Sequence, residues 1–75
     1  MIANEKELKK KREWFDDMYI TLKKNGAYFV YVKVASADIC TTYYEFRGDD
    51  KTVYLYYERE LVAIVHNIMD IEDVY

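Results

Sequence analysis

The first regular pattern of apolar and polar positions predicts a helix over about residues 4–24. At about 100° per residue, its large apolar side chains fall on one broad stripe. This stripe comprises Leu8, Trp14, Phe15, Met18, Tyr19 and Leu22. Asn4 is a favourable N-cap, and Glu7 three residues later completes a capping-box-like pattern. Asn25-Gly26 supplies a left-handed cap at the other end.

Three further segments are rich in the β-branched and aromatic residues typical of strands. They cover residues 27–34, 39–46 and 52–58. Residues 35–38 can turn the chain, and the glycine-containing segment 47–51 predicts a hairpin loop. Because both connections are short, we expect a three-stranded antiparallel meander.

The last segment is compatible with two structures. One helical stripe contains Leu61, Ile64, Val65, Ile68, Ile71 and Tyr75, which predicts a C-terminal helix. The many Val and Ile residues also suit a buried strand, and Glu58-Arg59-Glu60 could form a hairpin turn. We favour the helix, because strand alternation leaves the polar residues of segment 66–73 unsorted. The alternative is that this segment adds one or two strands.

These elements predict a single small α+β domain over residues 1–75, with an N-terminal helix, a three-stranded antiparallel meander and a C-terminal helix. This length is near the lower limit for folding on one hydrophobic core. The composition, 52% hydrophobic and 17% aromatic with no proline, favours an ordered chain. The first residues are too polar for a signal peptide, and no apolar run approaches a membrane span. We therefore expect a soluble, cytoplasmic protein with no membrane association.

Strand alternation divides the meander into two faces. The face expected under the N-terminal helix contains Val30, Val32, Tyr44, Phe46, Val53 and Leu55. The opposite face contains Phe29, Tyr31, Tyr43, Tyr54 and Tyr56, with Thr41 and Thr52 among them and Glu45 and Glu58 at its margins. Exposed aromatic patches of this kind mark interaction sites. The alternative is that the C-terminal helix covers this face and makes its tyrosines part of the core.

Tyrosine and charge together describe the expected partner. The chain has nine tyrosines, and each combines a broad apolar ring with a polar tip suited to a docking surface. Net charge is −3 overall, but residues 25–75 hold four Lys/Arg against nine Asp/Glu, which gives −5. This acidic balance disfavours a nucleic-acid backbone and favours a larger protein with a basic surface.

The basic run Lys9–Arg12 suggests nucleic-acid binding as an alternative function. However, five acidic residues share the same helix and can pair with it at i,i+3 or i,i+4 spacing. The strands also lack the glycine- and basic-rich signature of RNA-recognition sheets. We therefore interpret the run as a solvated helix face and expect no nucleic-acid partner.

Catalytic patterns are not visible in the chain. Cys40 would need a positioned base to act as a nucleophile, and His66 is the only histidine. His66, Asp70 and Asp73 would share one side of a C-terminal helix, which is too small a ligand set to predict a metal site. There is no glycine-rich phosphate loop. We expect no enzymatic activity, no cofactor and no metal.

The sequence thus predicts a non-enzymatic protein-interaction module that uses its tyrosine-rich face. One form of this hypothesis is an inhibitor that occupies the nucleic-acid groove of its target, with carboxylates in place of phosphates. In composition alone, the chain is similar to small acidic proteins of mobile elements, including some anti-CRISPR proteins. A self-associating structural domain, with this face or a strand edge buried in a homodimer, is the other alternative.

Overall fold

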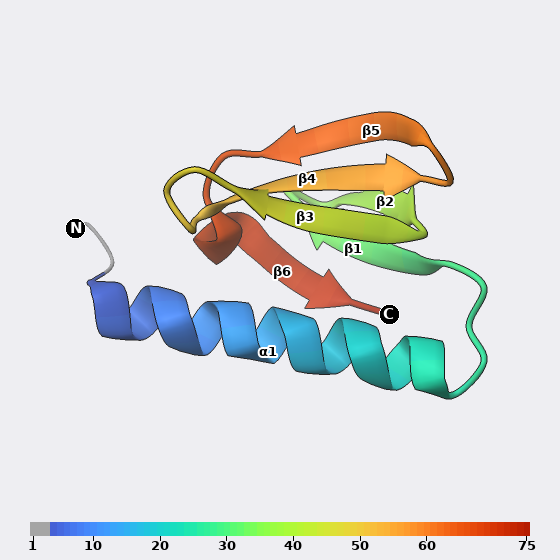
Figure 1. Cartoon of the computed structure of the whole chain (residues 1–75), viewed down its shortest axis with the longest axis horizontal. Coiled ribbons are helices and arrows are strands. Elements are labelled where there is room, and N and C mark those ends of the chain that lie inside the picture. The colour runs from blue at the N-terminus through green and yellow to red at the C-terminus, as the bar shows by residue number, and fades with distance from the viewer. Residues whose placement is uncertain (1–3) are drawn as a thin grey trace.

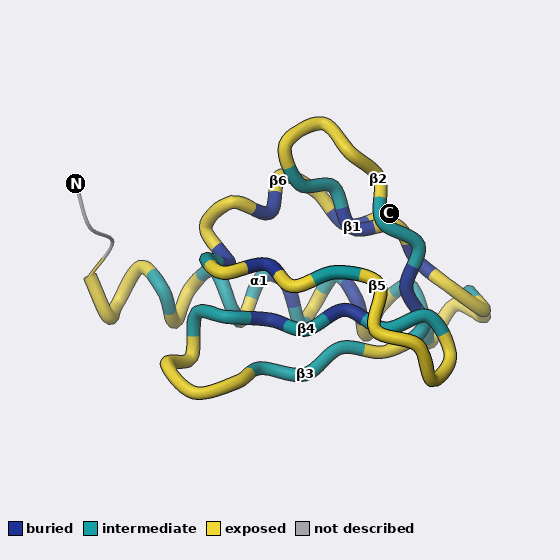
Figure 2. Tube along the Cα trace, turned by 90° about the horizontal axis from the view of Figure 1, so that it is seen from above, coloured by how far each residue is buried: buried dark blue, intermediate teal, exposed yellow. Residues whose placement is uncertain are grey.

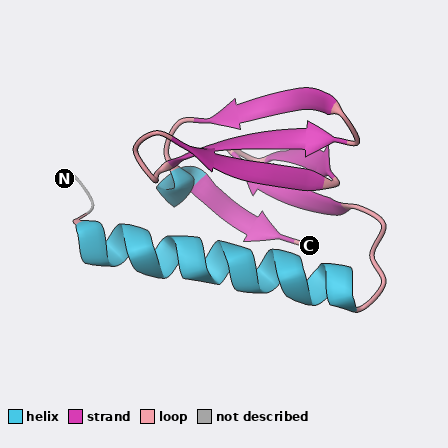
Figure 3. Cartoon of the chain, viewed as in Figure 1, coloured by secondary structure: helices cyan, strands magenta, loops and turns pink. Residues whose placement is uncertain are grey.

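The computed structural model describes residues 4–75, in which one long helix lies beside six strands (Figure 1). The elements are α1 (Glu5–Lys24), β1 (Val30–Val34), β2 (Ala37–Thr41), β3 (Tyr43–Arg47), β4 (Thr52–Tyr57), β5 (Glu60–Val65), the short 3-10 helix η1 (Ile68–Asp70) and β6 (Ile71–Val74). The strands form two antiparallel sheets with the orders β2-β1-β6 and β3-β4-β5. The expected α+β class is confirmed, as Figure 3 shows.

The two sheets share one core, and α1 runs along the side of both. Val32 of β1 and Leu55 of β4 are fully buried in the same cluster, to which α1 contributes Phe15 and Tyr19. In Figure 2, β3 and β4 lie on one side and β1, β2 and β6 on the other, with α1 running behind them. The inner surface of each sheet is therefore apolar, whereas the outer surfaces face away from the helix.

The helix begins and ends where its sequence predicts. The Asn4 side-chain oxygen accepts a hydrogen bond from the Glu7 N–H at 2.8 Å, which satisfies one of the free donors of the first turn. After the last turn, Gly26 has a φ of 93°, in the left-handed region that favours glycine. Phe15 is buried on the inner stripe, and Ile20 on the opposite side is 52% exposed.

The prediction of one strand over residues 39–46 is wrong, because the chain turns at Thr42. There β2 ends at Thr41 and β3 begins at Tyr43. The Thr42 N–H donates to the Tyr56 carbonyl at 2.8 Å, and this bond fixes the corner against β4. The chain passes from one sheet to the other at this point, so the predicted single meander is two sheets.

This corner also changes which face of the strand each residue occupies. Thr41, expected on the outer face, is fully buried, and its hydroxyl donates to the Val30 carbonyl at 3.2 Å. Beyond the corner, Tyr44 and Phe46 pack against the core as expected. Alternation therefore holds within each strand but is reset between β2 and β3.

The predicted C-terminal helix is wrong, and the alternative of added strands is confirmed by β5 and β6. Two irregularities interrupt the alternation that would have identified them. Val62 is an extra residue in a β-bulge, because Tyr56 pairs with Leu61 whereas the preceding residue of β4 pairs with Ala63. After β5, the side-chain oxygen of Asn67 accepts from the Met69 N–H at 3.0 Å and caps η1.

Tyr44 joins β3 to the helix and makes the stability of the fold sensitive to high pH. Its ring centroid lies 4.7 Å from that of Phe15 and 4.6 Å from that of Tyr19. Its hydroxyl donates to the Asp16 carboxylate. Burial, reinforced by this hydrogen bond, raises the pKa of Tyr44 well above its ordinary value of 10.0.

Because folding raises this pKa, the stabilisation is fully present below the pKa of an unfolded tyrosine, about 10, and is lost as the pH rises above it. We expect the free energy of unfolding, measured by urea denaturation, to fall between about pH 9 and about pH 11. Other raised tyrosines contribute to this slope, so Tyr44→Phe should make it shallower without abolishing it. Equal slopes for the two proteins would contradict this role of Tyr44.

Candidate functional site

The outer surface of the sheet β3-β4-β5 gathers most of the predicted site residues. The register places Tyr43 of β3 opposite Tyr56, which pairs in turn with Leu61 of β5. In the next outward row, Glu45 pairs with Tyr54, which pairs with Ile64. Paired residues lie on the same side of a sheet. We call this set the outer tyrosine face and define it as Tyr43, Glu45, Arg47, Tyr54, Tyr56, Leu61 and Ile64.

The outer tyrosine face is uncovered in the described chain. Tyr43 is 54% exposed, Leu61 44% and Ile64 40%, whereas their inward-facing neighbours Val53 and Leu55 are fully buried. Figures 1 and 2 show none of the elements of residues 4–75 over this surface. The C-terminal helix that could have covered it does not form, because that segment pairs into the two sheets instead.

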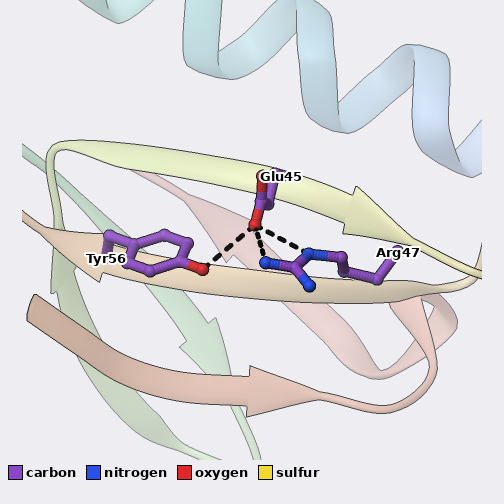
Figure 4. Close-up of polar contacts among 3 residues, drawn as sticks. All are labelled: Glu45, Arg47 and Tyr56. Atoms are coloured by element: carbon purple, nitrogen blue, oxygen red, sulfur yellow. Dashed lines mark hydrogen bonds and ion pairs between the residues drawn. The ribbon is translucent and has the colours of Figure 1, made fainter.

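A polar network holds the centre of this face (Figure 4). Oε1 of Glu45 accepts from the Tyr56 hydroxyl at 3.0 Å and from Nε of Arg47 at 2.7 Å. A second guanidinium nitrogen of Arg47 donates to the same oxygen. The guanidinium also lies over the ring of Tyr54, 4.7 Å from its centroid. The network therefore fixes an anion and a cation among the aromatic rings.

The charges of this network stabilise each other. Arg47, followed by the Tyr56 hydroxyl, holds the pKa of Glu45 below its ordinary value. Glu45 in turn raises the pKa of Arg47. Loss of hydration, with a further contribution from Glu45, raises the pKa of Tyr56. At neutral pH the face therefore presents an ionised carboxylate, an ionised guanidinium and a neutral phenol.

Phe29 and Tyr31 do not join this face. Tyr31 lies on the outer side of β1 in the other sheet, and Phe29 directly precedes that strand. Their ring centroids are 5.5 Å apart, and the ring centroid of Tyr31 lies 5.9 Å from that of Tyr75. A hydrogen bond to Asp38 raises the pKa of Tyr75 to about 12. The expectation that all five predicted aromatic residues share one face is wrong, because the strands that carry them belong to different sheets.

Glu58 lies at the margin of the outer tyrosine face, in the turn after β4. Its carboxylate accepts from the Tyr28 hydroxyl at 2.7 Å, and its N–H donates to Oγ1 of Thr42 at 2.5 Å. Sequence reasoning missed Leu61 and Ile64, because it placed them on a helix. The signal that could have found them is the density of Val and Ile in this segment, together with the possible turn at residues 58–60, because both indicate a strand.

The basic run of α1 is partly engaged by the fold itself. Arg12 forms an ion pair with Asp50 at 3.4 Å, and its guanidinium lies 4.4 Å from the ring centroid of Phe46. The Lys11 ammonium lies 4.2 Å from the ring centroid of Trp14, and burial lowers its pKa. These two cations contribute to packing of the helix surface and are less available to a phosphate backbone.

Comparisons with known proteins returned no match to any protein-family model, to any curated protein or to any solved structure. Among residues 4–75, no helix is both long enough and apolar enough to cross a membrane. The same part of the chain contains no group of three or more His, Cys, Asp or Glu side chains placed to hold a metal ion.

Proposed function

We propose that this chain is a non-enzymatic interaction module that binds a larger protein through the outer tyrosine face. The observation that carries this proposal is the exposure of Tyr43, Leu61 and Ile64 around the ordered network of Glu45, Arg47 and Tyr56. When a partner covers a patch of exposed apolar side chains, the burial of their surface favours binding. Because the central side chains are already held in place, little side-chain entropy is lost on binding.

The charge around the face supports a partner with a basic surface. Acidic side chains border it at both hairpins: Asp49 and Asp50 lie in the loop after β3, Glu58 lies in the turn after β4, and Glu60 begins β5. Residues 25–75 as a whole carry nine acidic against four basic side chains. Such a field steers a basic partner into contact and accelerates association at low ionic strength. A nucleic-acid-binding protein is one such partner, and the chain would then act as its inhibitor.

Self-association is the competing function that a specific observation favours. β5 is one of the two edge strands of its sheet, and three of its aliphatic residues, Leu61, Val62 and Ile64, are exposed. Unpaired strand edges with apolar side chains can pair with a second copy. Sedimentation at micromolar concentration separates the two functions. Only self-association predicts a dimer, and substitutions on the outer tyrosine face should convert it to a monomer.

The proposal is tested by the same substitution at two exposed isoleucines. Ile64→Arg places a long cation in the outer tyrosine face, and Ile20→Arg places it on the exposed side of α1. We expect the wild type and Ile20→Arg to capture the same basic protein from host extract, and Ile64→Arg to lose it. With the purified partner, the dissociation constant of Ile64→Arg should rise by about tenfold or more, because hot-spot contacts contribute about 2 kcal/mol.

Circular dichroism should show both variants folded. Equal binding by the two variants, or a captured partner with an acidic contact surface, would contradict the proposal. Tight, salt-sensitive binding of the purified chain to oligonucleotides would instead support the alternative through Lys9–Arg12.

A further inference from the structure

Glu45 uses only one of its two carboxylate oxygens within the described chain. Two of the three guanidinium nitrogens of Arg47 and the hydroxyl of Tyr56 donate to Oε1, as the dashed lines in Figure 4 show. Among residues 4–75, no side chain or backbone group donates to Oε2. The Glu45 side chain is 32% exposed. The centre of the outer tyrosine face therefore carries an anion with an unused acceptor.

A partner that covers this face cannot leave that oxygen without a donor. Burial of an ionised carboxylate oxygen away from water is strongly unfavourable unless a hydrogen bond replaces the lost hydration. Arg47 and Tyr56, the described donors that bind Glu45, both bind Oε1, so this arrangement leaves Oε2 without a donor. A donor from the partner would satisfy Oε2 while the network stays as it is.

Arg47 shows which donor suits the surroundings of Glu45. Its guanidinium combines two contacts, a carboxylate oxygen of Glu45 and the ring of Tyr54. A second pair of rings adjoins Glu45 on the same side of the sheet. Tyr43 precedes Glu45 by two residues in β3, and its ring centroid lies 5.7 Å from that of Tyr56, whose hydroxyl binds Glu45. A partner's donor to Oε2 can therefore have aromatic rings beside it, as the Arg47 guanidinium has.

We infer that Glu45, Tyr43 and Tyr56 form a binding site for an arginine side chain of the partner. The guanidinium donates to Oε2 of Glu45, and its plane stacks on the neighbouring aromatic rings. Arginine fits this site better than lysine, because its planar guanidinium can stack and offers several donors at once, whereas an ammonium is a compact, strongly hydrated charge. This inference rests on the proposed function, for which it names the chemistry that the partner must present.

The site can be tested with the full chain before any partner is known. The probe is the blocked tripeptide acetyl-Gly-Arg-Gly-amide, titrated while the backbone amide resonances are followed by NMR. We expect saturable shifts at Tyr43, Glu45 and Tyr56, and weaker binding of the matching lysine peptide. Glu45→Gln should raise the dissociation constant of the arginine peptide by about three- to tenfold, as expected for one exposed ion pair with an added cation–π contact. Glu13→Gln, at an exposed position on α1, should leave this dissociation constant unchanged.

A second variant separates binding by Glu45 from a merely structural role. Arg47→Gln removes the internal competitor for the carboxylate, so it should tighten binding of the arginine peptide. If Glu45 only supported the sheet, loss of either member of the pair would weaken binding alike. That result, or equal shifts from a glutamate peptide, would overturn the inference.

The outcomes also separate this inference from the proposed function. If Ile64→Arg abolishes partner binding but the partner binds Glu45→Gln as tightly as the wild type, the interaction face stands and the arginine site is wrong. If the arginine peptide binds at Glu45 but no partner depends on Ile64, the arginine site stands and the proposed function is wrong.

Discussion

Replacement of Phe15 by alanine should lower the free energy of unfolding by about 3–5 kcal/mol. Phe15 is fully buried, and its ring meets those of Tyr44 and Phe46 at centroid distances of 4.7 and 6.1 Å. Together with Tyr19, it packs α1 on the inner surface of β3. Truncation leaves a cavity lined by rigid aromatic rings, which cannot collapse to fill it. Domains have a total stability of about 5–15 kcal/mol, so this loss removes a large part of it.

Urea denaturation followed by far-ultraviolet circular dichroism measures this effect. Ile20→Ala is the matched control, because it removes an aliphatic side chain from the same helix at a position that is 52% exposed. We expect the control to change the free energy of unfolding by no more than about 1 kcal/mol. A similar, small change in both variants would mean that α1 is not packed on the sheet through its predicted stripe.

The helix was predictable from sequence because everything that defines it is local. The apolar stripe around Phe15, the Asn4 cap and the glycine at position 26 lie within or beside the element they specify. The hairpin of β3 and β4 was predictable for the same reason, since its loop contains Gly48 and both flanking segments alternate. Helix periodicity and short turns do not depend on distant contacts.

The division into two sheets was not predictable in the same way. It depends on the corner at Thr42, which is held by a hydrogen bond to the carbonyl of Tyr56, a residue in another strand. The C-terminal strands were obscured by the bulge at Val62 and by η1, which shift the alternation of apolar residues between β5 and β6. A chain segment with several Val and Ile residues suits either a helix or a strand until its partners are known.

These two causes explain which residues of the site could be predicted from the sequence and which could not. Tyr43, Glu45, Tyr54 and Tyr56 lie on one face because they belong to one hairpin, whose register follows from local alternation. Phe29 and Tyr31 were misplaced by the missed corner, and Leu61 and Ile64 by the missed strand. The outer tyrosine face therefore lacks the residues predicted from the β1 segment and includes residues of β5 that were not predicted.

Replacement of Tyr56 by alanine should weaken binding of the partner by about 2 kcal/mol, or about thirtyfold in the dissociation constant. Tyr56 lies at the middle of the outer tyrosine face. Its ring centroid lies 5.7 Å from that of Tyr43, and its hydroxyl donates to Glu45 at 3.0 Å. The substitution removes both the ring that would contact the partner and the hydroxyl that orients Glu45. Tyrosines at the centre of an interface, where water is excluded, commonly contribute this much.

Tyr56→Phe is the control that separates these two contributions. It keeps the ring and loses only the hydroxyl, so it should weaken binding by about 0.5–1.5 kcal/mol. Isothermal titration calorimetry with the purified partner measures both variants. Because Tyr56 lies on the outward side of β4, Tyr56→Ala should lower the free energy of unfolding by only about 1 kcal/mol, far less than Phe15→Ala. Destabilisation equal to that of Phe15→Ala would assign the ring to the core, and unchanged partner binding would exclude this face as the contact surface.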